Sequence, residues 1–281
     1  MKDANAIIGK NFKCGKNLRI GYNCIIEDNV ELGNDVFIDH NCIIRQNTKI
    51  GNQCNIGANC IIGEHLADFY KEHKVQNSGI TIGNNALIRS NTILYGDSII
   101  GDNFQTGHHV TIREKAVIGS NVSVGTLSDI QGDCEIGNYV RMHSSVHIGQ
   151  KSKIDDFVWI FPYVVLTNDP TPPSENLFGI HLKSFSVIAT GSTLLPGITV
   201  EQDTLVGAGS VVTRNVERNR VVVGNPAKVI ADINDIKDPI TKNPAYPWRL
   251  HFKRGMPWQE TDYVTWYKNI EGQVQSTGKD K

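Results

Sequence analysis

Residues 20–62 read IGYNCIIEDNVELGNDVFIDHNCIIRQNTKIGNQCNIGANCII, and a six-residue spacing within this stretch decides the fold. An apolar residue recurs at every sixth position from Ile8 to Ile62, again from Ile82 to Leu166, and again from Ile188 to Val212. We call this residue the beat. Of its 30 positions 29 are apolar, and Thr106 is the polar one. Neither a helix, with a period of 3.6, nor a single strand, with a period of 2, gives this spacing.

The residues between the beats indicate a sharp turn in each six-residue unit. The residue after the beat is Gly at half of the positions, and the third residue after it is Asn in seven of the first nine units. Gly and Asn enter left-handed backbone conformations at the lowest cost, so each unit is expected to be a short strand followed by a corner. Three units would close a triangle of 18 residues. The spacing of Cys24, Cys42 and Cys60 fits this, because these cysteines would stack in one interior column as packing residues.

The repeat therefore predicts an all-β solenoid, a parallel β-helix of about ten triangular coils. Two gaps in the beat, residues 63–81 and 167–187, are polar and are expected to be loops extruded from corners. We assign residues 1–230 to the β-helix domain and 231–281 to a C-terminal tail, with a short helix at 231–238. Three of the four tryptophans lie in that tail, which is expected to pack on the wall of the prism or on a neighbouring chain.

Composition limits the possible partners. The chain has 281 residues, with 28 basic and 29 acidic side chains and a net charge of -1, which argues against nucleic-acid binding driven by bulk charge. No apolar run approaches the roughly 20 residues of a membrane span, and residues 1–12 lack the features of a signal peptide. Six cysteines without an export signal are expected to be reduced. We therefore expect a cytoplasmic protein without nucleic-acid or membrane partners.

The three corners of the triangle differ in composition. One column of corners keeps Gly and Asn, as in 83–85, 101–103, 119–121 and 137–139, and is expected to be purely structural. The second carries aromatic and imidazole side chains at 89–91, 107–109, 143–145 and 161–163, and the third carries charged side chains at 95–97, 113–115 and 131–133. Both loops should leave from the third column. The two unusual columns would then frame one face, with Thr111, Asp129 and His147 pointing outward from it.

The pattern over residues 8–217 resembles the left-handed parallel β-helix of the hexapeptide-repeat acyltransferases. The resemblance implies a homotrimer with active sites between adjacent prisms. The segment TGHHVTIRE (106–114) resembles the stretch that carries the catalytic histidine in several amino-sugar and lipid A acyltransferases, and His108 matches that histidine. In many relatives an acidic residue comes next. Here His109 stands in that place, so Asp129 and Glu114 are the candidates for the residue that orients the catalytic base.

The end of the repeat resembles the closing signature of CoA-dependent members of this family. The segments are VGAGSVVTRNV (206–216) and VVVGNPAKVI (221–230). The resemblance implies acyl-CoA, with acetyl-CoA as the expected donor, and no metal. Small residues would leave backbone amides accessible to pantetheine, and basic residues would meet the CoA phosphates. The small residues are Ala189, Gly191, Gly207, Ala208 and Gly209, and the basic candidates are Arg214, Arg218, Arg220 and Lys228.

The segment VVLTNDPTPP (164–173) resembles enzymes that N-acylate nucleotide-linked amino sugars for surface polysaccharides, above all dTDP-3-amino- and 4-amino-dideoxyhexoses. The expected nucleotide contacts are Arg89 or Arg113 for the phosphates and Phe161, Pro162, Tyr163 or Tyr95 for the base. Asn168 and Asp169 are expected at the sugar amine. His109, Glu114, His143 and His147 complete the predicted substrate-binding set. His108 would either accept the amine proton or hold a sugar hydroxyl.

Three other interpretations compete with the N-acyltransferase prediction. An O-acyltransferase acting on a sugar or serine hydroxyl would use the same thioester chemistry. A γ-class carbonic anhydrase shares the solenoid and binds zinc through three histidines, and His143 and His147 invite that comparison. A non-catalytic scaffold would have ordinary corners in all three columns, contrary to the sequence.

Overall fold

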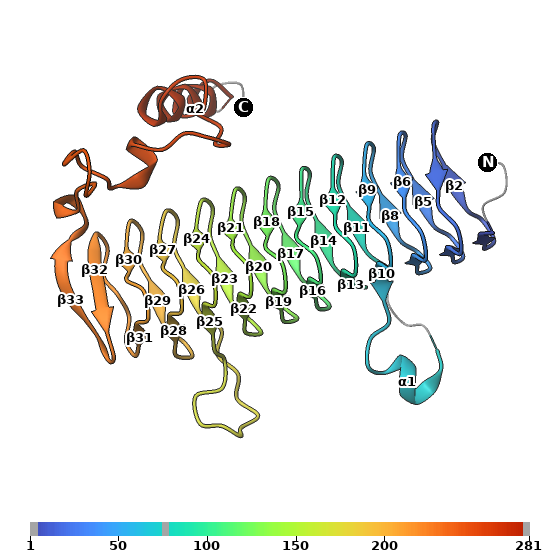
Figure 1. Ribbon diagram of the computed structural model, residues 1–281, viewed down its shortest axis with the longest axis horizontal. Coiled ribbons are helices and arrows are strands. Elements are labelled where there is room, and N and C mark those ends of the chain that lie inside the picture. Colours follow the sequence, from blue (N-terminus) through green and yellow to red (C-terminus); the bar gives the residue numbers. More distant parts are fainter. Residues whose placement is uncertain (1–4, 75–78, 278–281) are drawn as a thin grey trace.

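The computed structural model describes residues 5–74 and 79–277, and these form one long three-sided solenoid with two loops on one side and a tail on the other (Figure 1). Residues 75–78 of the predicted first loop and the last four residues of the predicted tail lie outside the described residues. The three sheets hold 11, 10 and 12 strands, so the solenoid has slightly more turns than the ten predicted. None of the described helices is long and apolar enough to cross a bilayer.

Except for the last two strands, consecutive strands belong to different sheets, which we name A, B and C in the order in which the chain visits them. Sheet A contains β1 (Ile7–Ile8), β4 (Ile25–Ile26), β7 (Ile43–Ile44), β10 (Ile61–Glu64), β13 (Ile93–Tyr95), β16 (Thr111–Ile112), β19 (Asp129–Ile130), β22 (His147–Ile148), β25 (Val165–Leu166), β28 (Thr193–Leu194) and β31 (Val211–Val212). Sheet B contains β2 (Lys13–Cys14), β5 (Glu31–Leu32), β8 (Lys49–Ile50), β11 (Thr81–Ile82), β14 (Ile99–Ile100), β17 (Val117–Ile118), β20 (Glu135–Ile136), β23 (Lys153–Ile154), β26 (His181–Leu182) and β29 (Thr199–Val200).

Sheet C ends in an antiparallel pair that closes the solenoid. It contains β3 (Arg19–Ile20), β6 (Phe37–Ile38), β9 (Asn55–Ile56), β12 (Leu87–Ile88), β15 (Gln105–Thr106), β18 (Ser123–Val124), β21 (Arg141–Met142), β24 (Trp159–Ile160), β27 (Val187–Ile188), β30 (Leu205–Val206), β32 (Arg220–Gly224) and β33 (Ala227–Asp232). The helical elements are α1 (Phe69–Glu72), the 3₁₀ turns η1 (Ile233–Asp235) and η2 (Trp248–Leu250), and α2 (Tyr263–Thr277). The short helix predicted at 231–238 is thus only the turn η1, preceded by the end of β33.

The predicted 18-residue turn is confirmed by strand register. Ile25 pairs with Ile43, and Thr111 pairs with Asp129, each 18 residues apart. From Ile26 to Val212 every beat residue is buried, and Thr106 is 3% exposed. The column Cys24, Cys42 and Cys60 is fully buried and free of disulfides. Inward side chains therefore form one continuous core along the axis.

The predicted left-handed corners are also confirmed. The third residue after the beat has a positive φ along the solenoid, from Asn11 at 56° to Asn103 at 57°. We name each corner column by the two sheets it joins: AB, BC and CA. In the C-terminal half of the BC corner the left-handed position is occupied by bulky residues, Tyr139, Phe157 and Phe185, with φ of 57°, 64° and 66°. Bulky residues seldom adopt this conformation, so another interaction must stabilise these corners.

The tail supplies that interaction. Trp248, Met256 and Trp258 pack against Phe157, Phe185 and the outward-facing Val187 of sheet C. The Trp248 indole N–H donates to the Phe185 carbonyl at 3.0 Å. The expectation that the aromatic tail packs on the prism wall is confirmed.

Both loops leave sheet A at the AB corner, as predicted, because β10 and β25 belong to the same sheet (Figure 1). The second loop is shorter than predicted. The chain re-enters the solenoid at His181, so the loop lies between Leu166 and β26, and residues 181–187 form an ordinary strand and corner. The sequence concealed this corner because Phe185 occupies the left-handed position that Asn usually takes.

Candidate functional site

The predicted site residues fall into two groups, one at the CA corner and the other on sheet A and its AB corner. The CA corner carries Arg89, His108, His109, His143, Phe161, Tyr163, Ala189, Gly191, Gly207, Ala208 and Gly209. Sheet A and its AB corner carry Tyr95, Arg113, Glu114, Asp129, His147, Asn168 and Asp169. The predicted framing of one face by two unusual columns is therefore present in the structure, although which of these residues act on a substrate remains a prediction.

His108 lies on the CA corner with its side chain exposed. It lines a hollow of about 240 Å³ together with Arg89, Ser90 and the outward side chains of sheet C, including Phe37 and Leu87. The His108 backbone N–H donates to Thr126 Oγ1 at 3.2 Å. Among the described residues, no hydrogen bond or ion pair holds its imidazole or the Arg89 guanidinium. Both groups are therefore available to a ligand.

Thr106, the polar beat, alters the backbone next to this hollow. At most corners the N–H after the beat donates to the carbonyl of the beat residue one coil on, as Gly57 does to Ile88. Arg89 N–H instead donates to the Thr106 hydroxyl at 2.9 Å. The hydroxyl thus replaces a ladder carbonyl at the corner that carries Arg89.

His109 has a structural role at the same corner. Its φ is 56°, so it occupies the left-handed position, and its Nε2 lies 3.4 Å from the side-chain amide of Asn91 in the preceding coil. This is the contact that stacked asparagines make elsewhere, as between Asn11 and Asn29. His109 therefore continues a structural ladder.

A second imidazole lies on sheet A in contact with a carboxylate. His147 Nδ1 is 3.1 Å from Asp129 Oδ2, across adjacent strands in register. Gln131 donates its side-chain amide to the same oxygen at 2.6 Å. Burial opposes ionisation of Asp129, but the hydrogen bonds from His147 and Gln131 outweigh it, and the pKa of Asp129 lies below its ordinary value. The carboxylate is therefore ionised at neutral pH.

Arg113 and Glu114 pair with each other. Arg113 Nε and Nη2 donate to the two Glu114 carboxylate oxygens at 2.8 and 2.9 Å, and the guanidinium lies 5.1 Å from the centre of the Tyr95 ring. Burial works against ionisation of Glu114, but the Arg113 hydrogen bond prevails and lowers the pKa of Glu114. Glu114 is thus committed to Arg113, and Asp129 is the carboxylate that contacts a histidine.

The remaining predicted substrate residues have different surroundings. His143 stacks on Phe161 with ring centres 4.6 Å apart, and burial against its neighbours lowers the pKa of His143. Tyr163 is 66% exposed. Asp169 accepts hydrogen bonds from Ser174 Oγ at 2.7 Å and from two backbone amides, so its carboxylate holds the second loop together. Within the described part of the chain, no three His, Cys, Asp or Glu side chains are placed to hold a metal ion.

The C-terminal coils present an open backbone at the CA corner. Gly191 and Gly209 have φ of 71° and 68°, and a Cβ added at either position would meet no atom within 4 Å. Lys228 pairs with Val223, whose side chain packs beside Gly207, so Lys228 belongs to this region. Arg214 follows β31 at the AB corner, at the opposite end of that strand from the glycines. The structure therefore separates Arg214 from the glycines and from Lys228.

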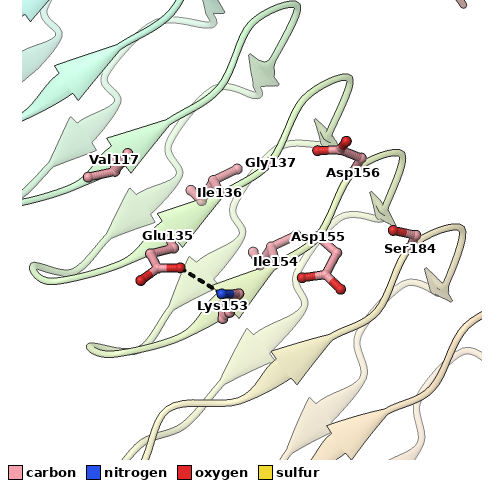
Figure 2. Close-up of a pocket in the computed structure, with 9 residues that line it drawn as sticks. All are labelled: Val117, Glu135, Ile136, Gly137, Lys153, Ile154, Asp155, Asp156 and Ser184. Atoms are coloured by element: carbon pink, nitrogen blue, oxygen red, sulfur yellow. Dashed lines mark ion pairs between the residues drawn. The ribbon is translucent and has the colours of Figure 1, made fainter. Parts of the chain in front are cut away.

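Two hollows contain groups that the sequence did not single out. One of them, of about 510 Å³, lies on sheet B and is lined by Asp155, Asp156, Ser184 and the Glu135–Lys153 ion pair, whose charged atoms are 2.9 Å apart. Figure 2 shows how these side chains surround it. Beside it His181 Nε2 lies 2.8 Å from Asp155 Oδ1.

The other hollow, of about 450 Å³, lies at the base of the first loop, where Arg45 bridges Glu27 at 2.7 Å and Glu64 at 3.5 Å. Glu27 and Arg45 occupy equivalent positions in successive coils of the AB corner, and their opposite charges could have predicted this network from the sequence.

Known proteins share this architecture. A family model described as the GMPPB C-terminal domain matches residues 34–133. The solved structure of UDP-N-acetylglucosamine O-acyltransferase (LpxA) from Moraxella catarrhalis aligns with 82% of this chain and 74% of its own, with a TM-score of 0.52 and 21% identity. The fold is the left-handed β-helix of the hexapeptide-repeat acyltransferases.

Several curated relatives carry acetyltransferase names, and two of them illustrate the similarity. A putative acetyltransferase of Saccharomyces cerevisiae (YJL218W) is 30% identical over 53% of this chain and 63% of its own length. Galactoside O-acetyltransferase of Escherichia coli is 27% identical over 59% of this chain and 70% of its own. This chain thus spans just under two thirds of the yeast relative. These relatives support the resemblance that the repeat suggested.

Proposed function

We propose that this chain is a CoA-dependent acyltransferase that N-acylates the amine of a nucleotide-linked amino sugar, a dTDP-3-amino- or 4-amino-dideoxyhexose, for a surface polysaccharide. The observation that carries the proposal is the CA corner. It brings His108 and Arg89, whose side chains have no hydrogen-bond or ion-pair partner among the described residues, to one hollow and continues to the open glycine corners of the last coils.

The spacing along this corner suits an extended thioester donor. His108 follows β15 and Gly191 follows β27, four strands further along sheet C. At about 4.8 Å per strand, this separation is about 19 Å. An acyl-CoA lying along the corner would hold its adenosine phosphates near Lys228 and Gly207 and its acyl group near His108. Backbone amides at the corner would stabilise the tetrahedral oxyanion.

Arg89 is better suited than Arg113 to bind the diphosphate of the acceptor. Arg113 already makes a bidentate pair with Glu114, whereas Arg89 is exposed and shares the hollow with His108. A free guanidinium can form two parallel hydrogen bonds to a phosphate group without first breaking an ion pair. Phe37 and Leu87 supply an apolar floor beside it.

A homotrimer belongs to the same proposal. Active sites between adjacent prisms would bring a second chain against the exposed His108 and Tyr163. Light scattering on the purified protein measures the mass directly, and a monomeric enzyme with full activity would contradict this part of the proposal.

The activity test incubates the full chain with acetyl-CoA and a panel of dTDP- and UDP-linked amino sugars, follows release of the CoA thiol, and identifies the acylated product by mass spectrometry. Matched sugars with a hydroxyl in place of the amine test O-acyl transfer, a second candidate supported by the E. coli galactoside O-acetyltransferase relative. Acylation of the hydroxyl sugars alone would select that candidate. Absence of thiol release with every acceptor would refute both.

Arg89→Gln and His108→Ala are expected to raise KM for the acceptor. His109→Asn is the matched control, because Asn readily adopts the left-handed conformation of His109. We expect this substitution to leave activity unchanged.

A further inference from the structure

The outward side of sheet A changes character between the two loops. From β4 to β25 the outward residue is Ile or Val at every strand except three consecutive ones, β16, β19 and β22. The outward residues of those strands are Thr111, Asp129 and His147, which pair in register. The first loop leaves at β10 and the second at β25, so this polar row lies between the two loops (Figure 1).

The contacts of His147 orient it as a proton acceptor. With Nδ1 donating its hydrogen to Asp129 Oδ2 at 3.1 Å, Nε2 carries the free lone pair. Asp129 is itself fixed by Gln131. The side chains of His147 and Asp129 are 41% and 38% exposed, so a substrate can reach the imidazole. A base held in one tautomer by a carboxylate is the arrangement that enzymes use to activate a nucleophile.

His108 lacks these features. Its backbone is held, the N–H by Thr126 Oγ1 and the carbonyl by Leu127 N–H, but within the described residues no hydrogen bond or ion pair fixes its ring or selects its tautomer. Its neighbour in the hollow is Arg89. These surroundings suit a residue that binds a hydroxyl or phosphate oxygen better than one that gains a proton during the reaction.

We propose that His147, oriented by Asp129, is the base of the acyl transfer, and that His108 binds the acceptor. This inference rests on the proposed function. The nitrogen of the acceptor amine forms a bond to the thioester carbonyl carbon, and His147 Nε2 takes a proton from that amine. When the C–S bond breaks, that proton passes to the departing CoA sulfur, so the products are the amide and free CoA, and the imidazole is neutral again.

The test compares His147→Gln with a matched pair on another face. His181 and Asp155 on sheet B lie 2.8 Å apart, and both are less exposed than His147 and Asp129. We expect His147→Gln to lower kcat at least about 100-fold with little change in KM, and His181→Gln to leave kcat unchanged. His108→Gln is expected to raise KM for the acceptor and to retain most of kcat.

The positioning role of Asp129 has its own readout. Asp129 faces His147 from β19, Arg113 lies beyond it at the end of β16, and β25 presents the uncharged Val165 on the other side. Asp129→Asn removes the carboxylate that holds the hydrogen on His147 Nδ1, so kcat should fall with little change in KM, and Asp129→Glu should recover part of the loss. This readout also serves if His147→Gln fails to fold, which circular dichroism detects.

The outcomes separate the two proposals. If the wild-type protein acylates no acceptor, the proposed function fails and this inference fails with it. If the wild-type protein is active and either His147→Gln or Asp129→Asn keeps the wild-type kcat, only the role of His147 is overturned.

Discussion

The contact between the tail and the solenoid allows a sharp prediction for Asp203→Asn. Asp203 lies at the BC corner with φ of 56° and its side chain 2% exposed. It pairs with the Arg249 guanidinium, which also lies over the Phe185 ring at 4.7 Å. Asn fits the left-handed position as well as Asp does, so the substitution removes the charge and keeps the corner.

The magnitude follows from the burial of the pair. Arg249 is 13% exposed, and removing one partner of a buried ion pair costs about 3–5 kcal/mol because the other charge is left uncompensated. Trp248, Met256 and Trp258 each contribute about 2 kcal/mol of apolar burial to docking, before the entropy of ordering the tail is subtracted. The loss is therefore comparable with the whole net stability of the docked tail. Coils contact only their neighbours, so the solenoid should remain folded while the tail dissociates.

Tryptophan fluorescence and limited trypsin digestion measure this dissociation. Three of the four tryptophans lie in the tail, so emission should shift to longer wavelength, and the exposed Lys253 and Arg254 should be cleaved faster. Glu135→Gln, at an exposed ion pair on sheet B, is the control and should change neither. Wild-type emission and cleavage rates in Asp203→Asn would refute the reasoning. So would a parallel loss of the β-sheet circular dichroism signal, because tail and solenoid would then unfold as one unit.

Three further predictions concern the face with the two unusual corners. Thr106→Val restores an apolar beat and lets Arg89 N–H donate to the backbone carbonyl again. The urea midpoint of unfolding should therefore stay unchanged or rise, while KM for the acceptor rises. A large loss of stability would contradict this. Because the pKa of Asp129 is lowered in the folded state, its contribution to stability is present above the unfolded value of about 3.9 and is lost as pH falls through the folded value. Acid titration of the urea midpoint should therefore show a smaller drop below about pH 4 in Asp129→Asn than in wild type, and equal drops would exclude the effect. Gly209→Ala meets open space but is strained at φ of 68°, so we expect a cost of about 1 kcal/mol in urea unfolding together with a higher KM for acyl-CoA; an unchanged KM would remove this corner from the CoA site.

Much of the fold could be predicted from the sequence because it depends on local chemistry. Inward beats and left-handed corners are each set by one residue type at one position, and the repetition of both fixes the register. The end of the second loop could not be predicted in this way. Phe185 takes the corner position against its own preference, and the tail that stabilises it there lies about sixty residues further along the chain. Interactions at that separation leave no trace in a six-residue pattern.

The same contrast separates structural from functional departures at the corners. Inward positions determine the solenoid, so corner and outward positions are free to vary, and an unusual residue there marks either docking or chemistry. Phe157 packs against the tail and Asp203 pairs with Arg249, so contacts within the chain explain why these two residues depart from the corner consensus. Arg89 and His108 stay exposed with no such partner among the described residues. Within the same part of the chain His147 has one side-chain partner, Asp129, and its Nε2 makes no further hydrogen bond. A ligand is expected where a residue departs from the corner consensus and no contact within the chain explains the departure. On this solenoid those residues lie on sheet A or at its borders.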